Sequence, residues 1–489
     1  MNNQGNTDDQ WRPRISREKR WPVFGALMLV MLLAAMDQTI VSTALPRIVG
    51  DLHGLSQYAW VATAYLLMST ITLPLYGKLS DIFGRKRILL FGVVVFLIGS
   101  ALCGISQSMT ELILARGFQG IGAGALMPVV VATMGDLFSP RERGRYQGLT
   151  GGVFAVASVI GPLVGGFITD NASWRWVFFV NLPLGIAALS ALLVLMPSYG
   201  QHKQGVKIDF AGAALLVVAL CTLLLGFNWA GTTYAWDSLP IVCLFGATAV
   251  ALAGFVVREL RAPDPIVELR LFRNPIVLVS SLVTMLIGAA MFGGIFFLPL
   301  FVQDVLGRTA ASSGTVMMPM MLTLVVGSFL SGMLITRSGR YKRNAVIGAA
   351  IIPVGAFLLL RLGLHSTSWD VALPMIVMGF GLGVGMSLYT TVVQNAVKPT
   401  QMGQATSTVT LFRQIGGMIG LAVFGSMMSG MTSVTAATAT VRASFAGSLH
   451  TVFIGVVIVA LFAMIASWFL KEIPLRHRTD DAPAPEPPL

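Results

Sequence analysis

The sequence predicts an all-helical protein that crosses a membrane many times, and three observations support this fold class. Of the 489 residues, 55% are hydrophobic and 11% are charged, whereas an average soluble domain has about 25% charged residues. The mean hydropathy of +0.78 indicates that lipid is the main solvent of the chain. The apolar residues form long runs, and basic residues gather in alternate loops between them. Such a chain is not a water-soluble enzyme, a secreted domain or a disordered scaffold.

Fourteen apolar runs are long enough to cross a bilayer, since a spanning helix needs about 20 residues. The first run contains Asp37 and ends at Leu45-Pro46 without a cleavage site, so we do not expect it to be a signal peptide. The expected helices are 21–46, 57–77, 87–107, 110–133, 147–170, 176–196, 209–229, 238–258, 275–301, 313–336, 344–363, 370–392, 403–429 and 449–470.

The 33 Lys and Arg residues predict how these helices are threaded. With the amino terminus inside, 26 of them fall in cytoplasmic segments, five fall in outer loops, and two, Arg116 and Arg413, fall within helices. Basic residues are retained on the cytoplasmic side of a membrane, and one helix more or fewer would reverse the alternation downstream. The asymmetry predicts fourteen helices with both termini in the cytoplasm. It also accounts for the net charge of +12 without a nucleic-acid partner.

An internal repeat divides the chain into two halves. Residues 77–87 (GKLSDIFGRKR) recur at 332–342 (GMLITRSGRYK), and the glycine run 120–124 recurs more weakly at 381–385. The copies occupy matching places if two helices are inserted between two bundles of six, and parallel repeats are typical of secondary transporters. The predicted units are a basic tail 1–20, a bundle 21–196, a linker with two inserted helices 197–274, a second bundle 275–470 and a disordered tail 471–489.

Asp37 is the carboxylate placed deepest in a predicted helix, about 14 Å below its outer end at 1.5 Å per residue. An ionised carboxylate is costly at that depth, so we expect Asp37 to be paired or to bind protons reversibly. A permanent salt bridge is the alternative. Arg116, about 9 Å below the outer end of its helix, is the expected partner, with a structural bond to helix carbonyls as the alternative. Arg413 is the second embedded cation, expected either to attract anions or to balance a carboxylate.

Five segments, taken in chain order, carry a resemblance to a known family. They are residues 36–46 (MDQTIVSTALP), the loop 77–87, residues 116–120 (RGFQG), residues 152–166 (ending GPLVGG) and residues 174–183 (WRWVFFVNLP). Together they resemble the fourteen-helix drug:proton antiporter branch of the major facilitator superfamily, over residues 21–470. The resemblance implies the major-facilitator fold, and proton coupling through Arg116 beside Asp37. Residues 412–417 (FRQIGG) resemble a further segment of the branch, which contains Arg413.

The loop 77–87 is expected to act as a conformational latch. Gly77 allows close helix approach, Asp81 can cap a helix amino terminus of the other half, and Arg85, which follows Gly84, can pair with Asp136. The resemblance implies that this cluster holds the cytoplasmic side closed. The alternative is a loop that only fixes topology. Thr336 stands in the second copy where the first has Asp81, so we expect a one-sided latch.

Small residues in the fifth expected helix form the antiporter motif: Gly152, Gly161, Pro162, Gly165 and Gly166. Plain helix packing explains them, while the resemblance implies a seal against leakage.

A substrate cavity near the bilayer midplane is expected because adaptable side chains lie at suitable depth. The 25 methionines and 9% aromatic residues supply soft apolar surface. For each cavity candidate, core packing or lipid contact is an equal alternative. The candidates are Gln38, Tyr65, Gln119, Phe154, Phe292, Phe296 and Phe412.

Motifs for other chemistry are missing from the sequence. It has no GxxxxGK[ST] phosphate loop and no HExxH, and its three cysteines lie in apolar runs without CxxC spacing. We therefore expect neither an enzyme nor a bound cofactor or metal, and an ion gradient must drive transport.

The sequence is thus predicted to encode a proton-coupled exporter of hydrophobic, often cationic compounds. We expect a monomer in the bacterial cytoplasmic (inner) membrane that works by alternating access. One alternative is a dedicated exporter of an endogenous metabolite, siderophore, peptide or lipid. A non-transporting membrane receptor ranks lower, because no added soluble domain is evident, and a lipid-modifying enzyme is disfavoured because no buried nucleophile and base are evident.

Overall fold

The computed structural model describes residues 17–137, 140–197, 209–230, 233–262, 265–338, 341–397, 401–428 and 439–473. Within these ranges the chain is helical apart from its connections, and its β-structure is limited to an isolated bridge between Ala230 and Tyr234. The prediction of an all-helical protein is confirmed.

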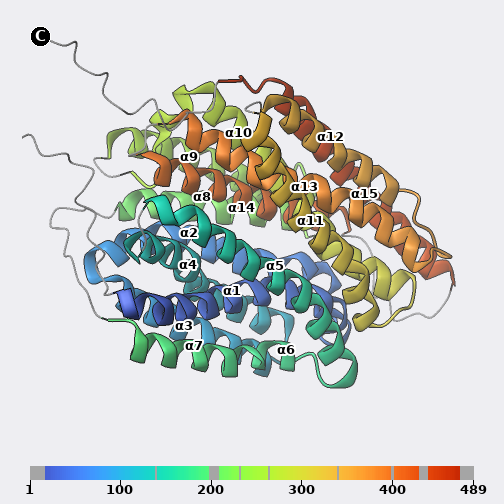
Figure 1. The fold of residues 1–489 in the computed structure, drawn as a ribbon. Coiled ribbons are helices and arrows are strands. Elements are labelled where there is room, and N and C mark those ends of the chain that lie inside the picture. The colour runs from blue at the N-terminus through green and yellow to red at the C-terminus, as the bar shows by residue number, and fades with distance from the viewer. Residues whose placement is uncertain are drawn as a thin grey trace, which may run out of the picture.

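The first half of the chain forms one group of packed helices, in the lower part of Figure 1. Within it α1 packs against α4, α5 and α7, while α4 packs against α2 and α3. The helices are α1 (Arg17–Asp51), α2 (Tyr58–Phe83), α3 (Arg85–Ile105), α4 (Met109–Leu137), α5 (Pro140–Asn171), the short α6 (Trp176–Phe179) and α7 (Asn181–Leu195), with a 3₁₀ turn η2 (Leu55–Gln57) before α2.

The second half forms a similar group, in yellow-green to red in Figure 1. Here α10 packs against α13, α14 and α15, and α13 packs against α11 and α12. The elements are α10 (Pro275–Leu300), which continues through a π-helical turn η4 (Phe301–Val305), then α11 (Ala310–Ser338), α12 (Lys342–Leu359), α13 (Ser368–Ala396), α14 (Met402–Met427) and α15 (Ala439–Trp468), with a 3₁₀ turn η3 (Leu269–Arg273) before α10.

Twelve helices among the described residues are long and apolar enough to cross a membrane. They do not include α2 and α5, which are 26 and 32 residues long and cover the predicted runs 57–77 and 147–170. The expected run 176–196 corresponds to α6 and α7, which are joined through Val180 in a helical conformation (φ −61°, ψ −23°) and together form one apolar span, Trp176–Leu195. Pro183 lacks the N–H that would bond the carbonyl of Phe179. The number of membrane crossings stays a prediction.

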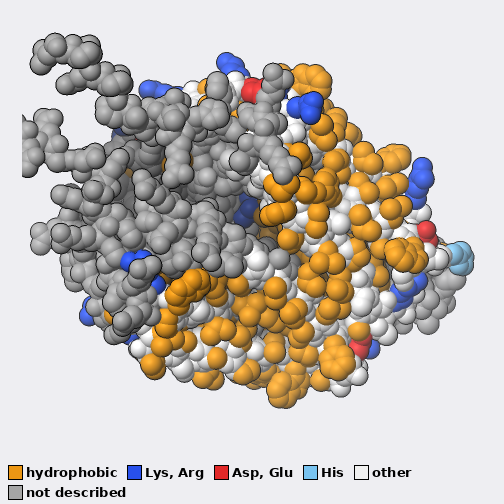
Figure 2. Space-filling view, in the orientation of Figure 1, with side chains coloured by type: hydrophobic (Ala, Val, Ile, Leu, Met, Phe, Trp, Pro, Cys, Tyr) orange, Lys and Arg blue, Asp and Glu red, His pale blue; other side chains and the backbone are white. Residues whose placement is uncertain are grey.

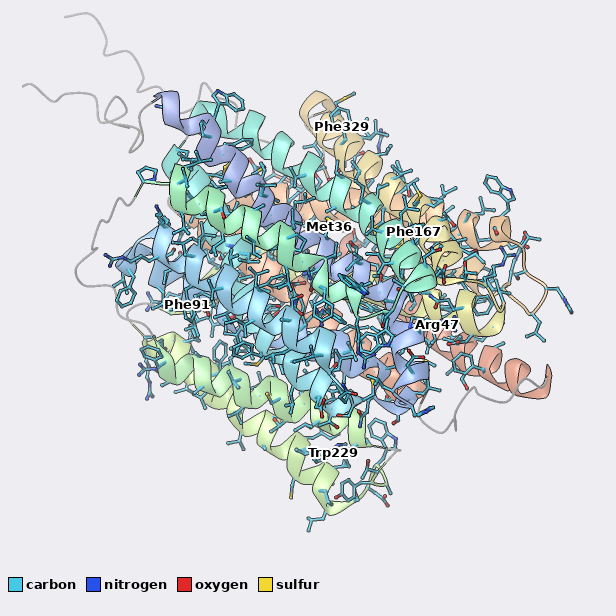
Figure 3. The ribbon with its side chains drawn as sticks, turned by 90° about the horizontal axis from the view of Figure 1, so that it is seen from below. Met36, Arg47, Phe91, Phe167, Trp229 and Phe329 are labelled. Atoms are coloured by element: carbon cyan, nitrogen blue, oxygen red, sulfur yellow. The ribbon has the colours of Figure 1, made fainter. Side chains whose placement is uncertain are left out.

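The outside of the helices is apolar, as Figure 2 shows over much of one face. Large apolar side chains stand exposed along several helices, for example Val194 at 82% and Val250 at 74%. Figure 3 labels Phe91, Phe167 and Phe329, which are also exposed. A soluble monomer rarely exposes continuous apolar surface on this scale, so the surface fits a lipid environment.

Alternate glycines set the packing inside each half. Along α4, Gly120 and Gly124 lie against the backbone of α2, while Gly122 lies against α3. Along α13, Gly379 and Gly383 lie against α11, while Gly381 lies against α12. These contacts match Gly120 with Gly379, so the pairing of Gly120 with Gly381 inferred from sequence is wrong by two residues. The structure therefore supports the internal repeat and corrects its register.

The two inserted helices, α8 (Phe210–Trp229) and α9 (Leu239–Arg261), form a hairpin beside both halves, because α8 packs against α2 and against α14. The Thr222 and Thr248 hydroxyls are 2.8 Å apart and join α8 to α9. Asp209 caps α8 through the Gly212 N–H at 2.9 Å and accepts from Arg258 Nε at 2.9 Å. Polar contacts thus join α8 and α9 at two places, between Thr222 and Thr248 and between Asp209 and Arg258.

The two halves meet closely at one end of the molecule. Asp170, near the end of α5, accepts hydrogen bonds from the Ala310 N–H at 3.0 Å and the Ala311 N–H at 2.6 Å, at the start of α11. An anion stabilises a helix amino terminus, so this is a cap supplied by the other half. We call this the Asp170 end; it carries the connections 51–58, 105–109, 171–176, 305–310 and 359–368.

Further polar contacts join the halves at the Asp170 end. The Gln303 amide in η4 donates to the Thr43 carbonyl of α1 at 2.7 Å and to Ser313 Oγ at 2.9 Å. The Tyr58 hydroxyl donates to the carbonyl of Phe296 in α10. This end is therefore held by hydrogen bonds from three different elements.

Replacing Gly166 should show that α5 and α11 depend on a glycine contact. A Cβ added at Gly166 would lie 2.5 Å from Ala310 O and from Ala311 Cα, both backbone atoms. We expect Gly166→Ala to lower the free energy of unfolding by about 1–3 kcal/mol, measured by thermal unfolding of the purified protein. Gly246→Ala is the control, because no described atom lies within 4 Å of its added Cβ. Equal melting temperatures for the two variants would contradict the contact.

Candidate functional site

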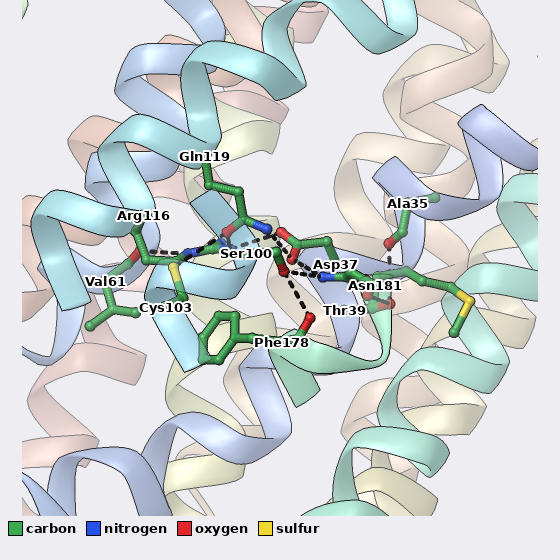
Figure 4. A network of polar contacts seen from close by, with 11 residues as sticks. Ala35, Asp37, Thr39, Val61, Ser100, Cys103, Arg116, Gln119, Phe178 and Asn181 are labelled. Carbon is green, nitrogen blue, oxygen red and sulfur yellow. Dashed lines mark hydrogen bonds and ion pairs between the residues drawn. The ribbon is translucent and has the colours of Figure 1, made fainter. Parts of the chain in front are cut away.

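The most deeply buried charges of the first half form an ion pair. Asp37 of α1 is fully buried and Arg116 of α4 is 1% exposed. Arg116 Nη1 lies 2.8 Å from Asp37 Oδ2 (Figure 4). Asp37 lies near the middle of α1, and Figure 3 shows the neighbouring Met36 among the helices and Arg47 nearer one end of α1. The expected pairing of Asp37 with Arg116 is present in the structure.

The second oxygen of Asp37 accepts two side-chain amides. Gln119 Nε2 and Asn181 Nδ2 each lie 2.9 Å from Oδ1. Arg116 Nη1 also donates to Gln119 Oε1 at 2.7 Å. Asp37 thus receives three hydrogen-bond donors, two from α4 and one from α7.

The guanidinium of Arg116 is held on several sides. It lies 4.1 Å above the centre of the Tyr65 ring and 5.9 Å from that of Phe178. Its Nε donates to the Val61 carbonyl of α2 at 3.3 Å. An arginine keeps its charge in proteins, and aromatic faces attract a desolvated cation. The cluster therefore contains a positive charge held by α2, α4 and two aromatic rings, paired with one carboxylate.

A further layer connects this pair to α3 and to the α6–α7 junction. Ser100 Oγ accepts from Asn181 Nδ2 at 3.0 Å and donates to the Phe178 carbonyl at 2.8 Å. The Cys103 thiol donates to Gln119 Oε1 at 3.7 Å. Six helices, α1, α2, α3, α4, α6 and α7, thus contribute polar atoms to one cluster.

Sequence reasoning missed two members of this cluster, Asn181 and Ser100. Asn181 lies within the 174–183 segment, where an amide in an apolar run was the available signal. Ser100 has no such signal, because many small hydroxyl residues in apolar helices bond their own backbone.

Two cavity candidates instead belong to the ion-pair cluster. Tyr65 and Gln119 are buried and contact Arg116, as described above. Gln38 is half-buried on α1 beside Asp37.

The aromatic cavity candidates lie elsewhere. The Phe292 and Phe296 rings of α10 stack 6.0 Å apart and are 4% exposed. Phe412 is half-buried and its ring contacts that of Phe272 at 5.3 Å. The Phe154 side chain lies outside the described residues. Six of the seven candidates have described side chains; among them Tyr65 and Gln119 contact Arg116 and Phe292 contacts Phe296, and a shared substrate cavity stays a prediction.

Arg413 lies apart from the Asp37 pair, on α14 in the second half. Its side chain is half-buried, and its backbone carbonyl lies against Gly288 of α10. Within the described part of the chain it makes no side-chain hydrogen bond or ion pair. The structure therefore does not place Arg413 opposite Asp37.

The latch loop forms a tight turn between α2 and α3. Gly84 joins the helices at φ 92°, a conformation that favours glycine. The Arg85 guanidinium donates to Ser80 Oγ, and Ser80 donates to the Gly77 carbonyl at 2.7 Å. The side chains of Asp81 and Asp136 lie outside the described residues, so their part in the latch stays a prediction.

The antiporter motif lets α5 touch helices of both halves. Gly161 and Gly165 lie against α1, where an added Cβ would meet Thr39 Oγ1 at 2.0 Å and the Ile40 carbonyl at 2.5 Å. On the other side, the carbonyl of Pro162 lies against Gly314 of α11, close to the Gly166 contact. Gly152 has no described atom within 4 Å of an added Cβ.

No candidate metal-binding cluster is found in the described ranges. They contain no group of three or more His, Cys, Asp or Glu residues that could hold a metal ion. Cys103, Cys221 and Cys243 are free thiols.

Comparisons with known proteins place this geometry in context. The family model described as Major Facilitator Superfamily matches residues 27–421. The multidrug transporter protein MdtP of Bacillus subtilis is 38% identical over 414 residues, covering 84% of this chain and 76% of that protein. Multidrug resistance protein 3 of the same organism is 38% identical over 403 residues, with 82% and 78% covered.

Solved structures show the same fold at low identity. The bacterial homolog of the human lysosomal transporter Spinster, in an inward-facing and unoccupied conformation, gives a TM-score of 0.65 at 18% identity, covering 93% of this chain and 98% of that one. An auto-inhibited POT family peptide transporter gives 0.64 at 15% identity, covering 94% and 99%.

A double-mutant cycle should show that Asp37 and Arg116 stabilise each other. We expect Arg116→Leu to lower the free energy of unfolding by about 3–5 kcal/mol, because it leaves a buried carboxylate without its cation. Adding Asp37→Asn should recover part of this loss. Thermal unfolding of the four purified proteins measures the coupling, and additive effects would contradict it.

Proposed function

Because the chain belongs to the Major Facilitator Superfamily, we propose that it is a proton-coupled exporter of hydrophobic, often cationic compounds. It is a multi-pass membrane transporter with relatives named for multidrug transport, and we assign it no enzymatic activity. The observation that carries the proposal is the buried pair of Asp37 and Arg116.

The pair suits proton coupling because its charge can change while one partner stays fixed. Binding a proton from solvent converts the Asp37 carboxylate to a neutral carboxyl, and the net charge of the cluster rises by one. Arg116 keeps its charge, so a protonated Asp37 leaves a buried cation without its counter-ion. That state is costly in a membrane, and a rearrangement of the surrounding helices relieves the cost.

Alternating access is supported by the contacts at one end of the molecule. At the Asp170 end the halves are joined through Asp170 and Gln303. With the predicted threading the Asp170 end faces outward, so we propose that this is an inward-facing arrangement.

We also propose fourteen membrane crossings with cytoplasmic termini, in a monomer of the bacterial inner membrane. The twelve apolar spans together with α2 and α5 support that count. In this arrangement the latch residues 77–85 lie at the cytoplasmic end. The α5 glycines, which contact α1 and α11, form the seal.

A dedicated exporter of an endogenous anionic compound is the second candidate. Arg413 is the observation that favours it, because this half-buried cation has no anionic partner among the described residues. In the first candidate Arg413 contributes to proton coupling instead.

Neutralising Asp37 should abolish proton-driven efflux. We expect Asp37→Asn to reduce ethidium efflux from an efflux-deficient bacterium to the level of cells without the protein, because the amide cannot exchange a proton. Fluorescence of cell-bound ethidium, with and without a protonophore, measures the effect. Asp237→Asn, in an exposed connection, is the control and should export normally. Protonophore-sensitive export by Asp37→Asn would refute the assignment.

A dedicated anion exporter gives a different result in the same cells. Wild-type protein would then protect against none of several unrelated cations and dyes, and would lose activity with Arg413→Gln.

Weakening the cap on α11 should expose the outer side. Asp170→Asn removes the anion and leaves one good acceptor for two N–H groups, a loss of about 0.5–2 kcal/mol. In a chain whose three natural cysteines are replaced by alanine, we expect a cysteine at the buried position Ser313 to react several-fold faster with an impermeant maleimide when Asp170→Asn is present. An unchanged rate would contradict a role for Asp170 in holding the outer side closed.

A further inference from the structure

Asn181 connects the Asp37 carboxylate to the junction of α6 and α7. It is the first residue of α7 and is 1% exposed. We propose that Asn181 is a positioning residue that switches with Asp37: its amide donates to the ionised carboxylate and, after turning about its Cβ–Cγ bond, accepts from the protonated carboxyl. This inference rests on the proposed protonation of Asp37.

The geometry at Asp37 requires such a change. All three side-chain groups that contact its carboxylate are donors: Arg116 on Oδ2, and Gln119 and Asn181 on Oδ1. When Oδ1 takes a proton from solvent, a new O–H bond forms and needs an acceptor. The two amide N–H groups that face Oδ1 would then oppose it. One of the two amides must turn to present its oxygen.

Gln119 is the amide that is held in place. Its oxygen already accepts from Arg116 Nη1 at 2.7 Å and from the Cys103 thiol. Turning the Gln119 amide would point its N–H groups at a permanently charged guanidinium. A hydrogen bond to a charged group is roughly twice as strong as a neutral one, so this turn is opposed.

Asn181 is the amide that can turn. Its second partner is the Ser100 hydroxyl, which can both donate and accept. Ser100 now accepts from Asn181 and donates to the Phe178 carbonyl. After the turn, Ser100 donates to Asn181 Oδ1 and releases Phe178. Protonation of Asp37 therefore removes the hydrogen bond from Ser100 Oγ to the Phe178 carbonyl of α6.

The α6 segment that contains Phe178 is connected by side-chain contacts to the Asp170 end. The Phe178 ring contacts that of Trp174 at 6.3 Å, and Trp174 Nε1 donates to Asp51 at the end of α1 at 2.9 Å. A change at Ser100 and Phe178 therefore reaches the end at which the two halves are joined.

The other titratable or charged groups around Asp37 that the structure describes are Arg116 of α4, Tyr65 of α2 and Cys103 of α3. Among the described residues, the packed helices α5, α7 and α10 add no charged group to this set. Asp37 is therefore the group expected to change charge in the cluster.

Infrared difference spectroscopy against pH tests the proposal without a substrate. The full-length protein is reconstituted in liposomes, and the carboxyl C=O band of Asp37 is assigned by its loss in Asp37→Asn. In Asn181→Leu, the protonated carboxyl loses its acceptor, so we expect this band to move to higher frequency. In the matched control Gln119→Leu, the band should keep the wild-type frequency. If a leucine variant does not elute as a folded protein, the alanine variants of both residues give the same comparison.

The outcomes separate this inference from the proposed function. An unchanged band frequency in Asn181→Leu, or equal shifts in both variants, overturns the role of Asn181. No band lost in Asp37→Asn overturns both proposals. A band that depends on Asn181, in a protein without proton-driven ethidium efflux, supports the switch and overturns only the proposed transport.

Discussion

The burial of one ion pair in a membrane protein constrains most of the first half. Asp37 and Arg116 are nearly without solvent contact, and a bilayer offers no water to replace a lost partner. Each atom of the pair must therefore be satisfied by protein. This requirement explains why α1, α4 and α7 meet at one level and why the Tyr65 ring lies under the guanidinium. The three groups that contact the Asp37 carboxylate are all hydrogen-bond donors, so the helices that carry them are arranged around this one side chain.

The helices were predictable because lipid imposes a simple rule on composition. Apolar runs located the helices, although α1 extends beyond its run to Asp51. Details that depend on backbone atoms were not predictable. The π-helical turn at Phe301–Val305 begins at the last residue of its predicted run and continues α10 through Gln303 and Asp304. The register of the glycine repeat was wrong by two residues, because alternate glycines look alike until the helix that each one faces is known.

The site was predictable where a charge was out of place in an apolar run. Asp37 and Arg116 stood out for that reason, and their contact is present. Gln119 lies three residues after Arg116, a spacing that places both on one face of α4, but sequence reasoning assigned it to a cavity. Asn181 is 144 residues from Asp37, and no local pattern links them. Arg413 shows the limit of the approach, since a second cation within an apolar run did not imply a shared site.

The alternate glycines of α4 and α13 have a consequence for how these helices can diverge. At Gly122 and Gly383, the nearest atoms to an added Cβ belong to the backbone of the neighbouring helix. A clash between the added Cβ and a side chain can be relieved by a smaller residue in the facing helix. A clash with backbone atoms cannot be relieved in this way, because every residue type has those atoms. No second-site substitution in the facing helix can therefore make room for alanine at these positions. Gly122 and Gly383 are thus expected to stay glycine as long as α3 and α4, and α11 and α13, keep their close approach.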